Sequence, residues 1–198
     1  MKFRALISSV VLVALPMFTN ASVINFEGTL QDYVPQAQGG TTTLAADKQS
    51  ISMSENIWSS FAGTFEITPD TIIAIDFKSE SVGEIHGIGF DTKNWFGGTR
   101  NSGTFFQFAG TQAYGNQAFN NYANDGEWRT YTIAVGQFFT GTFSHLVFIN
   151  DADNVTGITS QFRLTSDIQA SNVNEAPLLI LMTGLFGALI LKSSRKVS

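Results

Sequence analysis

Aromatic and short polar side chains alternate in two segments that show no strand pattern, Asp91–Gly103 and Thr111–Glu127. Sugar rings present C–H faces that stack on aromatic planes, and their hydroxyl groups need short polar partners. We therefore expect a shallow glycan-binding site in these loops. The residues expected to form it are Trp95, Arg100, Tyr114, Tyr122, Asp125 and Trp128.

The aromatic residues of these loops also have a structural interpretation, in which they close the core. Trp128 stands at the start of an expected strand, so packing against the core is favoured for it over sugar contact. For Trp95 and Tyr122 both interpretations remain open at the level of sequence.

A second candidate site is the run Asp151-Ala152-Asp153-Asn154, which follows an expected strand and opens a turn. Calcium is bound in proteins by several carboxylate and carbonyl oxygens, and two carboxylates one residue apart can supply the first of them. Asp91, at the end of another strand, could join Asp151 and Asp153. A solvated turn with Asx hydrogen bonds explains the same run without a metal.

Glu84 and His86 stand two residues apart on an expected strand, so both side chains should face one side of the sheet. That spacing permits a general acid/base pair or a metal pair. Their apolar neighbours favour a structural hydrogen-bonding role for His86. The sequence contains no nucleophile elbow, zinc-binding H-E-x-x-H or phosphate-binding loop. A glycosidase is not excluded, because its two carboxylates can come from any part of a chain.

The elements that must position these residues are β-strands. Short runs rich in Phe, Ile, Val, Thr and Tyr recur between Gly, Asn, Asp and Ser, with no sustained helical spacing between residues 22 and 172. This pattern predicts an all-β fold, an antiparallel two-sheet sandwich of the jelly-roll kind, over residues 22–170. Residues Gln36–Asp47 are expected to form a loop or a weak edge. The expected strands are Val23–Phe26, Ser50–Ser54, Gly63–Ile67, Thr71–Phe77, Glu84–Phe90, Thr104–Ala109, Arg129–Val135, His145–Ile149 and Gln161–Leu164.

Charge and composition narrow the possible functions of this domain. Between Ser22 and Asn172 there are fifteen acidic and six basic residues, a net charge of −9. Such a domain repels polyphosphates, so we expect no nucleic-acid partner. The chain has no cysteine, which excludes disulfides and thiolate chemistry. Eighteen Phe and three Trp must supply the core instead.

Both ends of the chain predict export. Residues 1–21 have a basic start, an apolar run and small residues at the end, which is typical of a secretory signal peptide. An uncleaved N-terminal anchor is the alternative. Near the other end, sixteen residues from Ala176 to Leu191 carry no charge, and three basic residues follow. We expect a linker over residues 171–177, one transmembrane helix over residues 178–191 and a basic cytoplasmic tail over residues 192–198.

The C-terminal run Asn174-Glu175-Ala176-Pro177, followed by an apolar segment and a basic end, resembles the PEP-CTERM sorting signal of Gram-negative bacteria. Glu175 and Pro177 match the motif, whereas its leading Pro is absent and Ala176 is inserted. The resemblance implies processing by an exosortase-like membrane protease and passage to the cell surface or matrix. A plain single-pass anchor, with the domain in the periplasm, is the alternative.

The domain itself resembles the non-catalytic, carbohydrate-binding-like β-sandwich modules of secreted bacterial polysaccharide-degrading enzymes. The resemblance spans roughly Thr64 to Phe162 and rests on four stretches: Thr68–Asp91, Phe108–Gln112, Trp128–Gly141 and Leu146–Asp153. It implies a binding protein for a polysaccharide and no catalytic activity. A structural matrix or adhesion protein, and a small polysaccharide lyase or hydrolase, are the other functions considered.

Overall fold

A computed structural model describes residues 26, 28–97, 102–164 and 169–170 of the chain. The expected signal peptide, sorting motif, transmembrane helix and basic tail lie outside the described residues, as does Arg100. Within the described part, no helix is long and apolar enough to cross a membrane.

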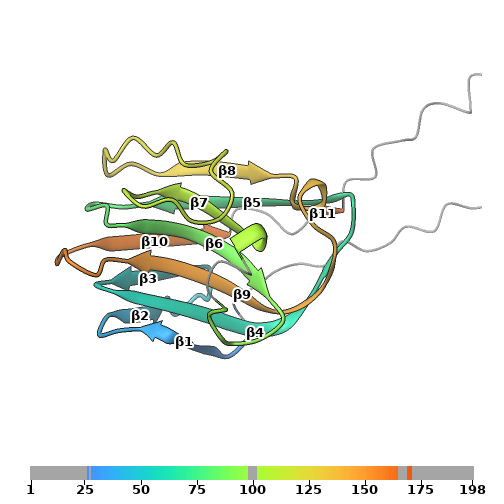
Figure 1. The fold of residues 1–198 in the computed structure, drawn as a ribbon, viewed down its shortest axis with the longest axis horizontal. Helices are drawn as coiled ribbons and strands as arrows, with labels where there is room; N and C mark the ends of the chain where they lie inside the picture. Colours follow the sequence, from blue (N-terminus) through green and yellow to red (C-terminus); the bar gives the residue numbers. More distant parts are fainter. Residues whose placement is uncertain (1–25, 27, 98–101, 165–168, 171–198) are drawn as a thin grey trace, which may run out of the picture.

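The first of two antiparallel sheets has five strands in the order β1-β4-β9-β6-β7 (Figure 1). β6 lies between β9 and β7, and every residue of β6 is buried. The strand bounds are β1 Leu30–Ala37, β4 Ile57–Ile67, β6 Ile85–Asp91, β7 Phe105–Ala109 and β9 Gly141–Asp151.

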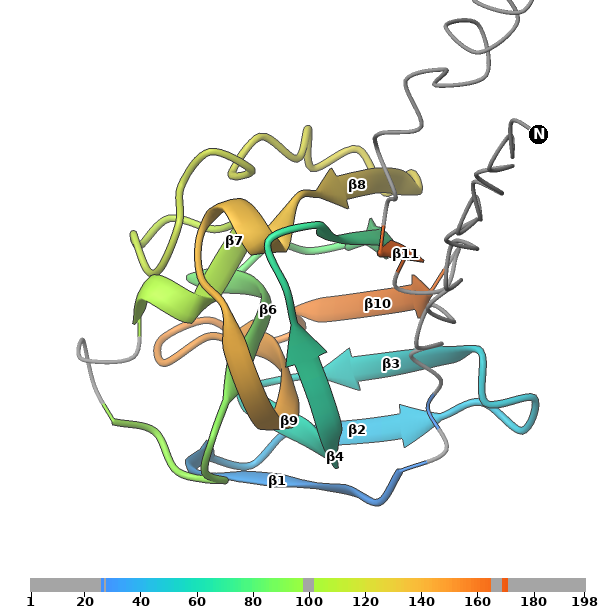
Figure 2. The ribbon, with the colours of Figure 1, turned by 90° about the vertical axis from the view of Figure 1, so that its right-hand side faces the viewer.

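The second sheet has six strands. β5 pairs with β10, β8 and β11, and β10 continues the sheet through β3 to β2. Figure 2 shows this sheet as a layer beside the first. The strand bounds are β2 Thr41–Leu44, β3 Ser50–Ser54, β5 Thr71–Lys78, β8 Arg129–Ile133, β10 Thr159–Leu164 and β11 Gln169–Ala170, and a short 3-10 turn, η2, covers Val135–Gln137.

The main core lies between the two sheets because alternate strand residues point to opposite faces. In β5, Ile73, Ile75 and Phe77 are at most 2% exposed and belong to this core, whereas Asp76 binds Arg163 of β10 on the other face. A second, smaller cluster covers the outer face of the five-stranded sheet, where Tyr33 and Trp58 are buried. The domain therefore has apolar packing on both faces of one sheet and on one face of the other.

The predicted all-β class is confirmed, and eight of the nine expected strands coincide at least in part with observed ones. The segment Gln36–Asp47 was expected to be a loop or a weak edge, and it contains the edge strand β2 at Thr41–Leu44, whereas β1 was not among the expected strands. Both are edge strands rich in polar residues, and β1 contains Pro35, which is tolerated at an edge because its missing N–H faces no neighbour. The expected strand Val23–Phe26 lies largely outside the described residues.

Candidate functional site

Trp95 lies in the loop after β6 and is 57% exposed. The main chain of this loop is nevertheless fixed to β1. Val34 and Trp95 form a parallel bridge, and the N–H of Phe96 donates to the carbonyl of Val34 at 2.6 Å. The hydroxyl of Tyr33 donates to the Trp95 carbonyl at 3.1 Å. The indole is thus presented to solvent on a loop whose backbone is held in place.

Asn94 ties the same loop to two further strands. Its amide nitrogen donates to the carbonyl of Asp32 in β1 at 2.8 Å, and its amide oxygen accepts from the hydroxyl of Ser60 in β4 at 2.8 Å. The N–H of Lys93 donates to Asp91 at 3.1 Å, which closes a turn at the end of β6. The bonds from this loop to Asp32, Val34 and Ser60 hold its backbone, and with it the base of the exposed indole, in one position.

A buried aromatic cluster lies beneath this loop. The rings of Tyr33 and Trp58 stack at 6.0 Å, and Phe96 and Tyr114 meet the Trp58 ring edge-on at 5.3 and 5.4 Å. The Tyr33 hydroxyl shares its single proton between Asp91 and the Trp95 carbonyl. Burial, followed by the hydrogen bond to Asp91, raises the pKa of Tyr33. Tyr114, expected to contact sugar, is instead a component of this cluster and supports the loop from below.

The three aspartates expected to share a calcium ion are not together. In the antiparallel register of β6 and β9, Asp91 lies opposite His145 at one end, and Asp151 lies opposite Ile85 at the other end. Six residues along a strand separate them by about 20 Å. Among the described residues, no group of three or more His, Cys, Asp or Glu side chains is placed to hold a metal. Asp91 therefore cannot join Asp151 and Asp153, and calcium at those two residues stays a prediction.

Asp151 is a buried carboxylate, 8% exposed, at the end of β9. Its Oδ1 accepts a 2.8 Å hydrogen bond from the indole N–H of Trp58. Burial raises the pKa of Asp151 to about 6, helped by the nearby charges of Asp153 and Glu84 and opposed by the Trp58 bond. Asp151 is thus a carboxylate that takes up a proton close to neutral pH.

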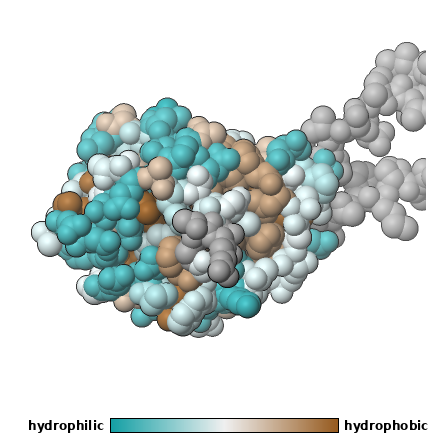
Figure 3. Space-filling view, viewed as in Figure 1, coloured by the Kyte–Doolittle hydropathy of each residue, from teal (hydrophilic) through white to brown (hydrophobic). Residues whose placement is uncertain are grey.

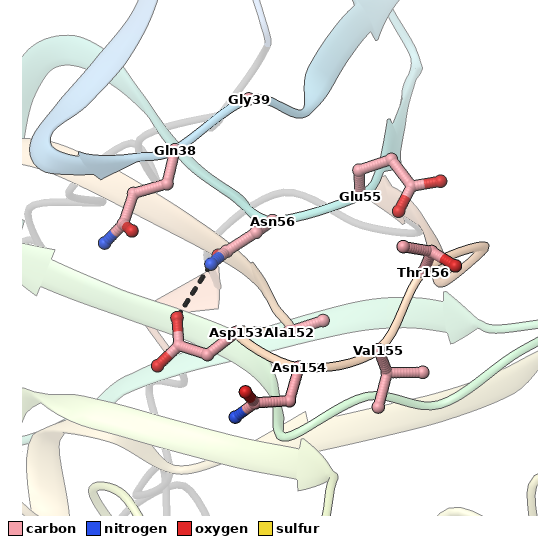
Figure 4. A pocket seen from close by; sticks show the side chains of 9 residues that line it. All are labelled: Gln38, Gly39, Glu55, Asn56, Ala152, Asp153, Asn154, Val155 and Thr156. Atoms are coloured by element: carbon pink, nitrogen blue, oxygen red, sulfur yellow. Dashed lines mark hydrogen bonds between the residues drawn. The ribbon is translucent and has the colours of Figure 1, made fainter.

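Next to Asp151, the loops before β2, before β4 and after β9 surround a recess of about 520 Å³. The side-chain amide of Asn56 donates to Asp153 at 2.8 Å across this recess. Figure 4 shows the side chains of Gln38 and Asn154 near this bonded pair. The carboxylate of Glu55 accepts from the N–H of Gly157 at 2.9 and 3.0 Å. The lining residues are Gln38, Gly39, Glu55, Asn56, Ala152, Asp153, Asn154, Val155 and Thr156.

Tyr122, Asp125 and Trp128 lie elsewhere, beside β5 and β8. The Tyr122 ring meets the core residue Phe77 edge-on at 4.9 Å, and its hydroxyl donates to Glu127 at 2.8 Å. Asp125 is exposed and accepts from the N–H of Glu127 at 3.1 Å, which closes a turn. Tyr122 and Asp125 thus fix the shape of their own loop.

Trp128 is 38% exposed, and the guanidinium of Arg163 lies 4.5 Å from the centre of its ring. Arg163 in turn binds Asp76. This indole is therefore engaged by a neighbour on the six-stranded sheet, whereas Trp95 extends beside the five-stranded sheet. Of the five described residues expected to form one glycan site, Trp95 and Tyr114 lie beside the five-stranded sheet, whereas Tyr122, Asp125 and Trp128 lie beside β5 and β8.

His86 is fully buried between the sheets. Its Nε2 accepts from the N–H of Gly83 at 2.6 Å, so Nδ1 carries the proton and donates to Ser160 at 2.6 Å. Ser160 donates onward to Asn150 at 2.7 Å. Burial lowers the pKa of His86 to about 4. Glu84 has a different partner, the N–H of Asp153 at 3.0 Å, so the two side chains are not arranged as an acid/base pair.

Neither the protein-family models nor the curated proteins with which the chain was compared gave a match.

Sequence reasoning missed several residues that shape these surfaces. Tyr33 and Trp58 were not singled out because their partners are distant in sequence. Tyr33 is 58 residues from Asp91, and Trp58 is 93 residues from Asp151. Asn56 and Gln38 were also missed. The one available signal was the polar run Ser54-Glu55-Asn56 between two apolar strand segments, which marks a turn.

Proposed function

We propose that this chain is a non-catalytic polysaccharide-binding protein whose main ligand contact is Trp95. The supporting observation is an indole 57% exposed on a loop fixed to β1 through Val34 and Tyr33. Removing an aromatic face from water is favourable, and stacking on the C–H face of a sugar would achieve this for Trp95. Val34, 39% exposed, lies beside it and extends the apolar surface.

The architecture supports this function at the level of the fold. Successive strands repeatedly cross from one sheet to the other, as in a jelly roll, and we assign the domain to that class. Fold alone does not establish function, so the proposal depends on the Trp95 loop.

Replacing Trp95 by Ala is expected to lower the affinity for a neutral polysaccharide about tenfold or more, because a buried aromatic contact would be lost. The measurement is affinity electrophoresis of the full-length chain in gels containing xylan, mixed-linkage β-glucan or galactomannan, with and without a calcium chelator. Trp128→Ala is the matched control, since that indole is already covered by Arg163. Its retention should equal that of the wild type.

Other outcomes of the same experiment would favour other functions. Absence of retention on every polysaccharide, with or without calcium, would overturn the proposal. Concentration-dependent self-assembly without sugar would favour a matrix or adhesion protein. Release of new reducing ends from the polysaccharide would favour a lyase or hydrolase.

We further propose that the protein is exported and anchored by the apolar segment of residues 178–191. Leu185→Arg is expected to release the protein from the membrane fraction, because an arginine at the centre of a membrane-spanning helix costs about 3 kcal/mol. Fractionation of cells that make either form measures this, with Leu185→Val as the control. A variant that stays in the membrane fraction would show that the tail is not the anchor.

A further inference from the structure

The recess lies next to Asp151, whose carboxylate binds Trp58 of the cluster beneath the Trp95 loop. Trp58 packs on the outer face of the five-stranded sheet with Tyr33 and Phe96. Asp151 connects the aromatic cluster with the recess, because it accepts a hydrogen bond from Trp58 and lies close enough to Asp153 for the two charges to repel. The surface at the Trp95 loop and the recess are thus neighbouring parts of the molecule.

The spacing between these two parts fits an extended ligand. Asn94, the residue before Trp95, binds Ser60 of β4, and Asn56 at the recess precedes Ser60 by four residues, next to the start of β4. Four residues of strand cover about 13 Å, which exceeds a single sugar ring. A ligand that contacts both parts must therefore be a chain of several sugar units.

The recess contains hydrogen-bonding groups that the protein does not use. The Asn56 side-chain oxygen is buried and has no hydrogen-bond partner among the described residues. In the part of the chain that the structure describes, the side-chain amide of Asn154 forms no hydrogen bond. The side-chain amide of Gln38 donates only a long 3.3 Å bond to Gln36. An unpaired buried oxygen is destabilising, so a ligand hydroxyl that donates to Asn56 would be favoured.

The charge of the recess selects the kind of sugar. Its lining includes the carboxylates of Glu55 and Asp153 and no basic residue. In Figure 3, hydrophilic side chains predominate at the end of the molecule where the β9–β10 loop lies. Uncharged hydroxyl groups can donate to these carboxylates, whereas uronate or sulfate groups would be repelled.

We propose that the recess is a second subsite for the polysaccharide, where Gln38, Asn56, Asp153 and Asn154 bind the hydroxyl groups of an uncharged sugar a few units from the one stacked on Trp95. This inference rests on the proposed function and adds to it a direction for the bound chain and a ligand class. The two subsites are linked only through the bound sugar chain. The affinity gained from the second subsite must therefore depend on the length of the ligand.

The test is calorimetry of the full-length chain with short and long oligosaccharides from the neutral polysaccharide that the wild type retains. The wild type should bind long oligosaccharides about tenfold more tightly than short ones. The double variant Gln38→Ala, Asn154→Ala should lose most of that gain while its affinity for short oligosaccharides is unchanged. Gln49→Ala, Asn120→Ala is the control, since it removes the same exposed residue types from other loops.

The outcomes separate the recess from the Trp95 surface. Equal length dependence in the wild type and the recess variant would overturn the second subsite, while a loss of binding in Trp95→Ala would still support the proposed function. Polygalacturonate bound as tightly as the neutral polysaccharide would overturn the assignment of an uncharged ligand. Failure of the wild type to bind any polysaccharide would overturn both.

Discussion

In a chain that carries Asp151→Asn, lowering the pH from 7 to 4 is expected to reduce the free energy of unfolding by about 3 kcal/mol through His86. The pKa of His86 falls from 6.5 to about 4 in the folded state. Between these values the unfolded chain binds more protons than the folded one, so stability is lost as the pH falls. Each pKa unit corresponds to about 1.4 kcal/mol, which gives the stated magnitude.

The wild-type chain is expected to change far less over the same range, because Asp151 acts in the opposite sense. Its pKa rises from 3.8 to about 6, so the folded state binds more protons in this window and gains stability as the pH falls. Asn at position 151 removes this titration and still offers an oxygen to the Trp58 indole. Asp151→Asn should also stabilise the domain at pH 7, since a buried charge is removed from beside Asp153 and Glu84.

Urea unfolding at several pH values measures both effects, with the wild type, Asp151→Asn and His86→Gln compared pairwise. His86→Gln should lower stability overall, yet its unfolding free energy should rise toward low pH relative to the wild type. Parallel curves for all three proteins would show that neither group titrates abnormally in the folded state. The remaining carboxylates are the same in all three proteins, so their contribution cancels when the unfolding free energies are subtracted.

The fold could be predicted from sequence where burial imposes a clean alternation. In the expected strand Thr71–Phe77, Ile73, Ile75 and Phe77 alternate with other residues, and the structure places these three in the core and Asp76 on the other face. β2 could be expected only as a loop or a weak edge, for a physical reason. A short Thr-rich edge strand gains its stability from one neighbour, β3, and its own side chains carry little hydrophobic signal.

The candidate site was predictable only in part, because its members are brought together by strand order. The exposure of Trp95 could not be separated by sequence from the burial of Tyr114, since both are aromatics in polar loops. The two differ because Tyr114 lies over Trp58 and Phe105, which come from β4 and β7. Similarly, Asp91 and Asp151 end adjacent strands, yet these run antiparallel and place them at opposite ends.

Phe77→Ala is expected to destabilise the domain by about 3–5 kcal/mol, the largest effect predicted here for a single side chain. Phe77 is fully buried in β5 of the six-stranded sheet. Its ring lies 5.6 Å from Phe108 of β7, in the five-stranded sheet, and 5.2 Å from Phe162 of β10. A cavity at this position would therefore weaken packing between the two sheets.

Phe138→Ala is the matched control, because Phe138 is 42% exposed and should cost about 1 kcal/mol or less. Urea unfolding of the three proteins at pH 7 gives the comparison. Phe77 also supports Tyr122, whose hydroxyl holds the loop at Glu127, so the loop before β8 should become more open to protease in Phe77→Ala. Equal losses of stability in the two variants would mean that the sheets are not held together at Phe77. A large loss confined to Phe77→Ala, with binding at Trp95 unchanged, would separate the core that joins the sheets from the outer face proposed to bind sugar.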